Sequence, residues 1–206
     1  MDADAVEIRV LGCLIEKQRT TPDVYPLSLN SLRAACNQTT NRDPVVFYDE
    51  SEIRSALERL GRKRWTRLAS GAGSRAAKYR HLLDEALSLD GAELSLLGVL
   101  MLRGAQTPGE LKQRVERLHR FESLADVERA LEGLVERRLA ARLPRRPGQK
   151  EERYLQLLGG DEVAEAEPAR ADTEAPEHRP ALEERVARLE AEVARLATAL
   201  ESLQGR

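Results

Sequence analysis

A short stretch that occurs twice decides the fold of this chain. It reads Leu11-Gly12-Cys13-Leu14-Ile15 and returns, 86 positions later, as Leu97-Gly98-Val99-Leu100-Met101. The pair Thr21-Pro22 returns at the same offset as Thr107-Pro108. Self-similarity at a fixed offset indicates an internal duplication, in which each copy is one supersecondary unit. The first 160 residues therefore contain the same folding unit twice.

The two copies differ in length at one place. Ala56-Leu57-Glu58 returns as Ala130-Leu131-Glu132, but only 74 positions later. The first copy is therefore longer by 12 residues, and the extra length falls within residues 23–48. We treat this stretch as an insertion in the first copy.

Hydrophobic periodicity places the same elements in both copies. In the first copy we predict three helices and two strands, at about 6–15, 28–37, 50–64, 65–69 and 77–82, with a turn at 70–74. In the second copy we predict helices at about 92–103, from 108 onward and at 125–139, and a hairpin within 139–157. Three helices followed by a two-stranded hairpin is the order of a winged helix, a variant of the helix-turn-helix.

The predicted fold class is α+β, mainly α. We expect two tandem winged-helix domains, at 1–88 and 89–158, a disordered linker at 159–180 and a coiled-coil helix at 181–204. The linker has almost no large apolar side chains, which is typical of disorder. Because each copy has its own apolar stripes, we expect each winged helix to bury a separate three-helix core.

An apolar residue recurs near the C-terminus with alternating spacings of four and three. The positions are Leu182, Val186, Leu189, Val193, Leu196, Leu200 and Leu203. Valine at two of the three a positions, with leucine at d, favours a parallel two-stranded coiled coil, so we predict a homodimer. The seam spans barely more than three heptads, so a helix that folds back onto the body is the competing interpretation.

Charge is divided between the body and the tail. The net charge is −2, but residues 1–160 carry +4 and residues 161–206 carry −6. A mildly basic body gives weak support for nucleic-acid binding. The candidate DNA contacts of the first copy lie on the outward side of its third helix and near its hairpin tip. They are Arg54, Ser55, Arg62, Arg75 and Lys78.

The second copy is a poorer candidate for DNA contact. Its third helix leaves Arg129, Glu132 and Glu136 outward, and a net acidic face repels phosphates. Its hairpin carries further candidate contacts, Arg145, Arg146 and Lys150. Contact with a partner and simple solvation weigh equally for this basic loop.

Several motifs together resemble a known family. They include Leu11-Gly-Cys-Leu-Ile-Glu-Lys-Gln18, Thr20-Thr-Pro-Asp-Val-Tyr-Pro-Leu-Ser28, Asn41-Arg-Asp-Pro-Val45 and Thr107-Pro-Gly-Glu-Leu111. With these motifs the chain resembles the YceH family, bacterial proteins of unknown function with a tandem winged-helix fold. The resemblance covers about residues 5–158. It implies the fold and no established activity.

The inserted stretch allows two interpretations. Residues 37–43 are polar and end in Asp43-Pro44, and Asn and Asp side chains commonly tie such loops to their own backbone. The first interpretation is a structural loop. In the second, the insertion flanks a binding surface, with Gln38 and Arg42 as contact groups.

The sequence contains no recognisable catalytic or metal-binding arrangement. His81, His119 and His178 are scattered, and no pair has metal-ligand spacing. We therefore expect no enzyme activity, no metal and no cofactor. We interpret Cys13 and Cys36 as small core residues in a reducing compartment, with a redox pair as the less favoured alternative.

One glycine-rich segment resembles a dinucleotide-binding motif. Gly71-Ala-Gly-Ser-Arg-Ala76 matches the loose dinucleotide-binding fingerprint. That fingerprint requires a helix directly after it, whereas a strand follows here, so a flexible hairpin tip is favoured.

Two functions remain open from the sequence. We expect a cytoplasmic protein without a membrane segment, because no signal peptide and no long apolar stretch is found. The first hypothesis is a non-enzymatic, transcription-associated protein that binds double-stranded DNA. The alternative is an adaptor that binds another protein through its winged-helix surfaces without contacting DNA.

Overall fold

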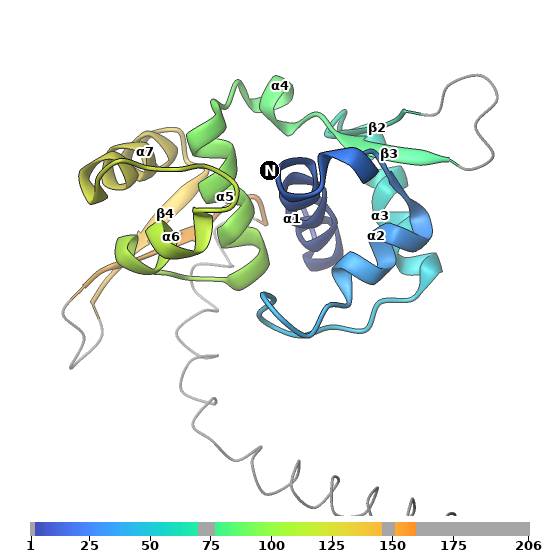
Figure 1. The fold of residues 1–206 in the computed structure, drawn as a ribbon, viewed down its shortest axis with the longest axis horizontal. Helices are drawn as coiled ribbons and strands as arrows, with labels where there is room; N and C mark the ends of the chain where they lie inside the picture. The colour runs from blue at the N-terminus through green and yellow to red at the C-terminus, as the bar shows by residue number, and fades with distance from the viewer. Residues whose placement is uncertain (1–2, 70–76, 146–150, 160–206) are drawn as a thin grey trace, which may run out of the picture. The chain divides into compact units, whose positions relative to one another are not determined.

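A computed structural model describes residues 3–69, 77–145 and 151–159 (Figure 1). Within these ranges the protein has seven α-helices, one short 3-10 helix and two small antiparallel sheets. The predicted class, α+β and mainly helical, is confirmed at this level. The predicted turn at 70–74 and the C-terminal segment from 160 onward, with its proposed linker and coiled coil, lie outside the described residues.

The first half contains the elements that periodicity predicted. They are α1 (Ala5–Thr20), α2 (Leu29–Cys36), α3 (Glu50–Arg62), β2 (Thr66–Leu68) and β3 (Lys78–His81). Each helix begins at a side-chain cap, where Asp4, Ser28 and Asp49 accept a backbone N–H of the first turn. The buried stripe of α3 consists of Ile53, Ala56, Leu57 and Leu60.

Two short elements of the first half were not predicted. After the 3-10 helix η1 (Pro22–Val24), the two-residue strand β1 (Leu27–Ser28) pairs with β3, with Leu27 opposite Tyr79. The sheet order is therefore β1-β3-β2. Two residues are too few for an alternating pattern to be recognised in the sequence.

The second half repeats this plan with smaller connections. Helix α4 (Leu83–Leu87) leads into α5 (Gly91–Arg103), α6 (Pro108–Val115), α7 (Leu124–Glu136), β4 (Ala140–Leu143) and β5 (Arg153–Gln156). A capping box opens α6, in which the Thr107 and Glu110 side chains each accept the other residue's backbone N–H. A single bridge between Gln106 and Tyr154 stands where the first half has the β1–β3 pairing.

The repeated Thr-Pro pairs occupy different places in the two halves. Thr107 caps the second helix of its half, whereas Thr21-Pro22 precedes η1 and the second helix of the first half begins after Ser28. The structural counterpart of Thr107 is therefore Ser28. The extra residues of the first half are split, with some before α2 and the rest between α2 and α3.

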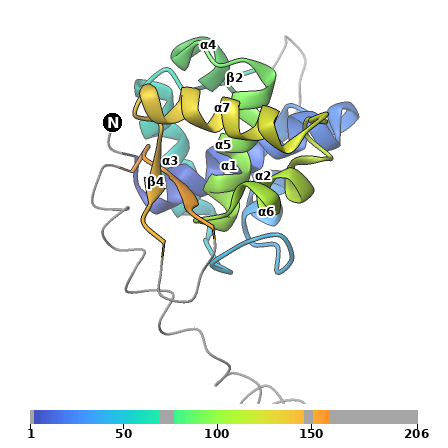
Figure 2. The same ribbon diagram turned by 90° about the vertical axis from the view of Figure 1, so that its left-hand side faces the viewer.

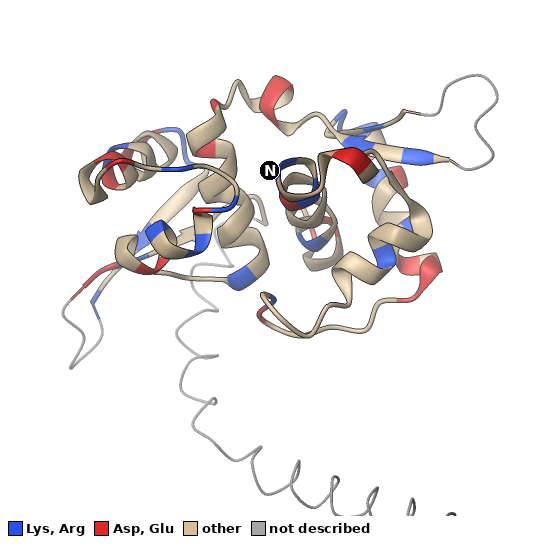
Figure 3. Ribbon diagram, viewed as in Figure 1, with Lys and Arg blue, Asp and Glu red and all other residues tan. Residues whose placement is uncertain are grey.

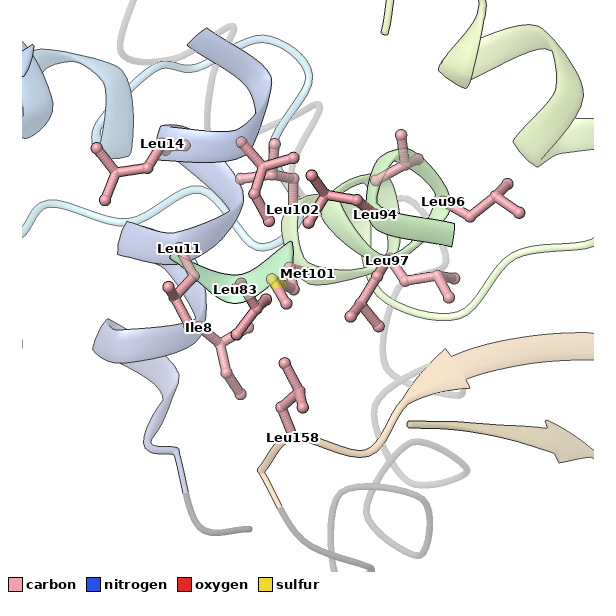
Figure 4. Packing of buried hydrophobic residues seen from close by; sticks show 14 of the residues in the cluster. Ile8, Leu11, Leu14, Leu83, Leu94, Leu96, Leu97, Met101, Leu102 and Leu158 are labelled. Carbon is pink, nitrogen blue, oxygen red and sulfur yellow. The ribbon is translucent and has the colours of Figure 1, made fainter. Parts of the chain in front are cut away.

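The buried side chains of both halves form one connected core. Helices α1 and α5 pack side by side, with α2 and α3 on one side and α6 and α7 on the other (Figures 1 and 2). Figure 4 shows Ile8 and Leu11 of α1 facing Leu83, Met101 and Leu158. The expectation of two separate cores is therefore wrong. Periodicity identified the buried faces of α1 and α5 but not that they bury against each other.

Glycines of the repeated motif lie at this helix contact. A Cβ on Gly12 would lie 2.9 Å from the Leu102 side chain, and a Cβ on Gly98 would lie 2.9 Å from Ile15 Cγ2. Gly12 and Gly98 are the equivalent residues of the two copies. The duplicated motif thus brings the halves together, because each copy contributes the residue that permits close approach.

Backbone hydrogen bonds also join the halves. The Asp43 N–H of the insertion donates to the Leu102 carbonyl at the end of α5, at 2.9 Å, and the Ala3 N–H donates to the Leu158 carbonyl at 2.8 Å. Among the described residues, no helix has both the length and the apolar character needed to cross a bilayer.

Candidate functional site

The outward face of α3 carries three of the predicted contact residues. Arg54, Ser55 and Arg62 are all exposed, on the side opposite the buried stripe. Arg54 forms an exposed ion pair with Glu50 at 2.5 Å. Arg62 has no ion pair with any described residue. Arg62 can therefore offer an uncompensated guanidinium. Arg54 can exchange Glu50 for another partner easily, because an exposed ion pair is weak.

The hairpin of the first half extends the positive charge. Arg67 of β2 and Lys78 of β3 are exposed, and Arg67 lies opposite Arg80 in the strand register. Figure 3 shows Lys and Arg on both strands of this hairpin. Arg80 is paired with Glu85 at 2.9 Å. Arg75, predicted at the hairpin tip, lies outside the described residues.

Two cations on the flank of α3 have a structural role. Arg59 contacts Asp4 at 2.5 Å, and Lys63 contacts Glu7 at 2.9 Å. Glu7 is buried although it is charged. These pairs tie α3 to the start of α1 and fix the direction in which its outward face points.

The third helix of the second half has the opposite charge at equivalent positions. Its cap Ser123 corresponds to Asp49, so Glu128 and Glu136 stand where the first half has Arg54 and Arg62. Arg129, also outward, is paired with Asp126 at 2.8 Å. A face of this charge repels a phosphate backbone.

The second hairpin pairs its strand cations with carboxylates. Arg142 lies between Glu132 and Glu152, at 3.8 and 3.5 Å, and Arg153 contacts Glu110 at 2.7 Å. Arg145 is exposed just beyond β4. The other predicted contacts of this hairpin, Arg146 and Lys150, lie outside the described residues.

Arg42 is a buried structural residue, so its assignment as a surface contact is wrong. Its guanidinium binds both carboxylate oxygens of Glu16 on α1, at 3.1 and 2.6 Å. The same group donates to Gln38 Oε1 at 2.8 Å and to the carbonyls of Ala35 and Asn41. Gln38 is thereby held as well. Around Arg42, these contacts support the first of the two interpretations, a structural loop.

Burial and the Arg42 charge act in opposite directions on Glu16. Burial alone raises the pKa of this carboxyl, but the hydrogen bonds and charge of Arg42, helped by Lys17, outweigh burial and hold it below its usual range. Glu16 is therefore ionised in the folded protein, as a bidentate partner of Arg42 requires.

Both cysteines are buried, as predicted, and carry free thiols. The hydrogen bond with Cys13, together with burial, raises the pKa of Cys36. A protonated thiol is a poor nucleophile, so Cys36 is suited to packing. Arg9, a second buried arginine, donates to the Pro44 carbonyl at 2.6 Å and helps to hold the insertion. Helical periodicity could not identify this role, because Arg9 lies within an otherwise apolar helix.

His81 is a buried, neutral residue. Burial lowers its pKa to about 4, and attraction to Asp84 opposes this only in part. Its Nδ1 accepts the Leu83 N–H at 3.3 Å, so Nε2 donates to Gln18 at 2.7 Å. Across the described residues, no group of three or more His, Cys, Asp or Glu side chains could hold a metal ion.

The sequence match covers both halves. Residues 3–149 match the family model described as "Protein of unknown function, DUF480". The chain belongs to this family. The UPF0502 protein GSU0233 of Geobacter sulfurreducens is 50% identical over an alignment of 194 positions, which covers 93% of this chain and 88% of that protein. The UPF0502 protein azo0627 of Azoarcus sp. is 48% identical over an alignment of 210 positions, which covers 98% of this chain and 93% of that protein.

The family membership agrees with the resemblance expected from the motifs at the level of an uncharacterised bacterial family. The YceH name is not tested by these matches and stays a prediction. The DUF480 description names no activity.

Proposed function

We propose that the chain is a non-enzymatic, tandem winged-helix protein that binds double-stranded DNA through its first half. The element order supports this fold, because α1, α2 and α3 precede the antiparallel β2–β3 hairpin and α5, α6 and α7 precede the antiparallel β4–β5 hairpin. In winged helices the third helix and the hairpin commonly meet the nucleic acid. The corresponding elements here are α3 and the β2–β3 hairpin.

The contrast between the two halves carries the proposal. At equivalent positions the first half has Arg54 and Arg62, and the second has Glu128 and Glu136. Arg62 and Arg67 have no ion pair with a described residue, so phosphates would meet uncompensated guanidinium groups. The two halves thus share a scaffold and differ in charge where a winged helix contacts DNA.

The proposed contact set follows from this assignment. It consists of Arg54, Ser55, Arg62, Arg75 and Lys78 of the first half, with Arg67 added and with Arg145, Arg146 and Lys150 of the second hairpin as flanking groups. Phosphate contacts of this kind position a protein on DNA without reading its sequence. We therefore expect affinity to depend strongly on salt.

Fluorescence anisotropy with a double-stranded DNA probe, measured over a salt series, tests the proposal. Arg62→Glu/Arg67→Glu should weaken binding by about tenfold or more and make the salt dependence shallower, because two phosphate contacts are lost. Arg120→Glu, at a side chain 87% exposed in the second half, is the control and should change affinity little. Binding that is absent, or that does not change with salt, would remove the DNA proposal.

An adaptor that binds another protein is the second candidate. One observation favours it: Phe47 of the insertion is 80% exposed and Val45 is 44% exposed. Exposed aromatic residues are enriched at protein interfaces. In that case Phe47→Ser would abolish binding of the partner, while Arg62→Glu/Arg67→Glu would not.

We also propose that the chain is a homodimer through the heptad pattern from Leu182 to Leu203. A dimer would present two first halves to one DNA molecule and increase avidity. Sedimentation equilibrium of the full chain tests this, with Leu189→Lys/Leu196→Lys as the disrupting variant. A monomer at micromolar concentration would reject the dimer and favour a helix that folds back.

A further inference from the structure

A cavity of about 420 Å³ lies where the two halves meet. The first half contributes the end of α1 and the insertion, and the second half contributes the end of α5, the α6 helix and the segment after α6. This volume is in the range of small-molecule binding sites. The walls are mainly polar, and Val99, Leu102 and Leu118 form the apolar part.

The lining of this cavity is strongly positive. Lys17, Arg103, Arg114 and Arg117 all line it, and Glu16 is the one carboxylate among its lining residues. The Glu16 carboxylate is already bound by Arg42 through both oxygens, and Lys17 approaches it at 3.3 Å. The cavity therefore keeps an excess of positive charge that its own side chains do not neutralise.

Nearby carboxylates do not remove this excess. Glu110 lies 3.7 Å from Arg114, but it also binds Arg153 at 2.7 Å and caps α6 through the Thr107 N–H. Arg117 has no ion pair with a described residue. Arg114 and Arg117 thus have guanidinium nitrogens available to a bound molecule.

The positive side chains around the cavity are close enough to repel one another. Burial lowers the pKa of Arg103, and repulsion from Arg114 and then from Arg42 adds to the effect. Attraction to Glu16 and Asp43 opposes this shift only in part. Arginine stays protonated in proteins, so a bound anion would reduce the repulsion further. A hydrogen bond from Arg103 to the Asn41 side chain orients the guanidinium at the cavity wall.

We propose that this cavity binds a small phosphorylated metabolite. Arg103, Arg114 and Arg117 would hold its phosphate groups, since the planar guanidinium matches phosphate geometry, and Lys17 would add a further charge from the first half. Because the lining comes from both halves, the ligand would also link them. This site lies apart from the proposed DNA contacts on α3 and the first hairpin, so the two proposals can fail independently.

Isothermal titration of the full chain with inorganic pyrophosphate, at constant ionic strength and without divalent metal, tests the proposal. We expect saturable binding by the natural protein and an increase in its Tm. Arg114→Gln and Arg117→Gln should each weaken binding about tenfold. Arg120→Gln is the matched control, because it removes the same charge three residues after Arg117 and outside the lining.

Each outcome decides the proposal. Weaker binding in Arg114→Gln and Arg117→Gln, with Arg120→Gln unchanged, supports it. No binding at about 10 mM pyrophosphate, or equal weakening in all three variants, overturns it. Citrate that binds as tightly as pyrophosphate overturns the phosphate assignment, because the cavity would then respond to charge alone. Far-UV circular dichroism verifies that the variants are folded, as expected for exposed side chains.

Discussion

At the scale of single residues, buried charges decide how the insertion is held. Arg42 has a fully buried side chain and satisfies its donors with Glu16, Gln38 and two carbonyls. Removing one partner of a buried pair leaves the other charge uncompensated, which costs far more than losing an exposed pair. Arg54 and Glu50 form such an exposed pair on α3.

This contrast gives a matched prediction. Arg42→Met should lower the free energy of unfolding by about 3 kcal/mol, because Glu16 loses its main partner in a nearly buried place. Arg54→Met should cost less than about 1 kcal/mol. Urea unfolding at pH 7 measures both, and the double variant Arg42→Met/Glu16→Met should recover part of the loss. Equal effects of Arg42→Met and Arg54→Met would contradict the buried role of Arg42.

His81 makes stability depend on pH. Its pKa of about 4 in the folded protein lies below the value of about 6.5 expected after unfolding. Protons therefore bind the unfolded state more tightly. The stabilising effect is complete above about pH 6.5 and is lost as the pH falls toward 4, by up to about 1.4 kcal/mol per pH unit.

The measurement is the free energy of unfolding between pH 7 and pH 5. It should fall in the natural protein and fall less in His81→Gln. By nuclear magnetic resonance, the imidazole signal that is missing in His81→Gln should titrate below pH 5 in the natural protein. A midpoint near 6.5 would refute the burial argument.

At the scale of elements, the contact between α1 and α5 depends on two glycines. Gly12 and Gly98 each face side chains of the other helix at a distance that leaves no room for a Cβ. Gly61, on α3, has open space at the same position. The three residues separate the effect of packing from the general preference of helices for alanine.

Alanine at these positions should act in opposite directions. Gly12→Ala and Gly98→Ala should each destabilise the protein by about 1–3 kcal/mol, because Leu102 and Ile15 must move in a packed core. Gly61→Ala should stabilise it by about 0.5–1 kcal/mol through its lower unfolded-state entropy. Thermal unfolding of the three variants measures this. A stable Gly98→Ala would mean that the helices are farther apart than described.

At the scale of the whole molecule, one continuous core couples the two halves. Trp65 is the only tryptophan and lies buried in the first half. Leu131 is fully buried on α7 in the second half. Because the core continues through α1 and α5, we expect loss of packing at Leu131 to destabilise the surroundings of Trp65 as well.

The prediction is a single cooperative transition. Leu131→Ala should lower the urea midpoint reported by Trp65 fluorescence, with a loss of about 2–5 kcal/mol. The midpoint from circular dichroism should shift equally. Glu132→Ala, an exposed neighbour on the same helix, is the control and should have little effect. A Trp65 midpoint unchanged in Leu131→Ala would show that the halves unfold independently.

Much of the architecture could be predicted because it depends on local information. Caps, turns and apolar spacing act over a few residues, so both hairpins and every α-helix except the five-residue α4 were placed from the sequence. The charge of the outward face of α3 was predicted for the same reason. The position of Arg42 could not be, since its partner Glu16 is 26 residues away and a polar loop gives no periodic signal.

The amino-acid sequence by itself determined the duplication, the order of the elements and the residues that each helix buries, because these follow from the period of the backbone. Only the tertiary structure decided that the two apolar cores join through Gly12 and Gly98, that Arg42 is enclosed and that four cations surround one cavity. These features require residues of both copies, or of distant segments, to meet in space. Close packing and electrostatic interactions depend on distances that spacing along the chain does not reveal.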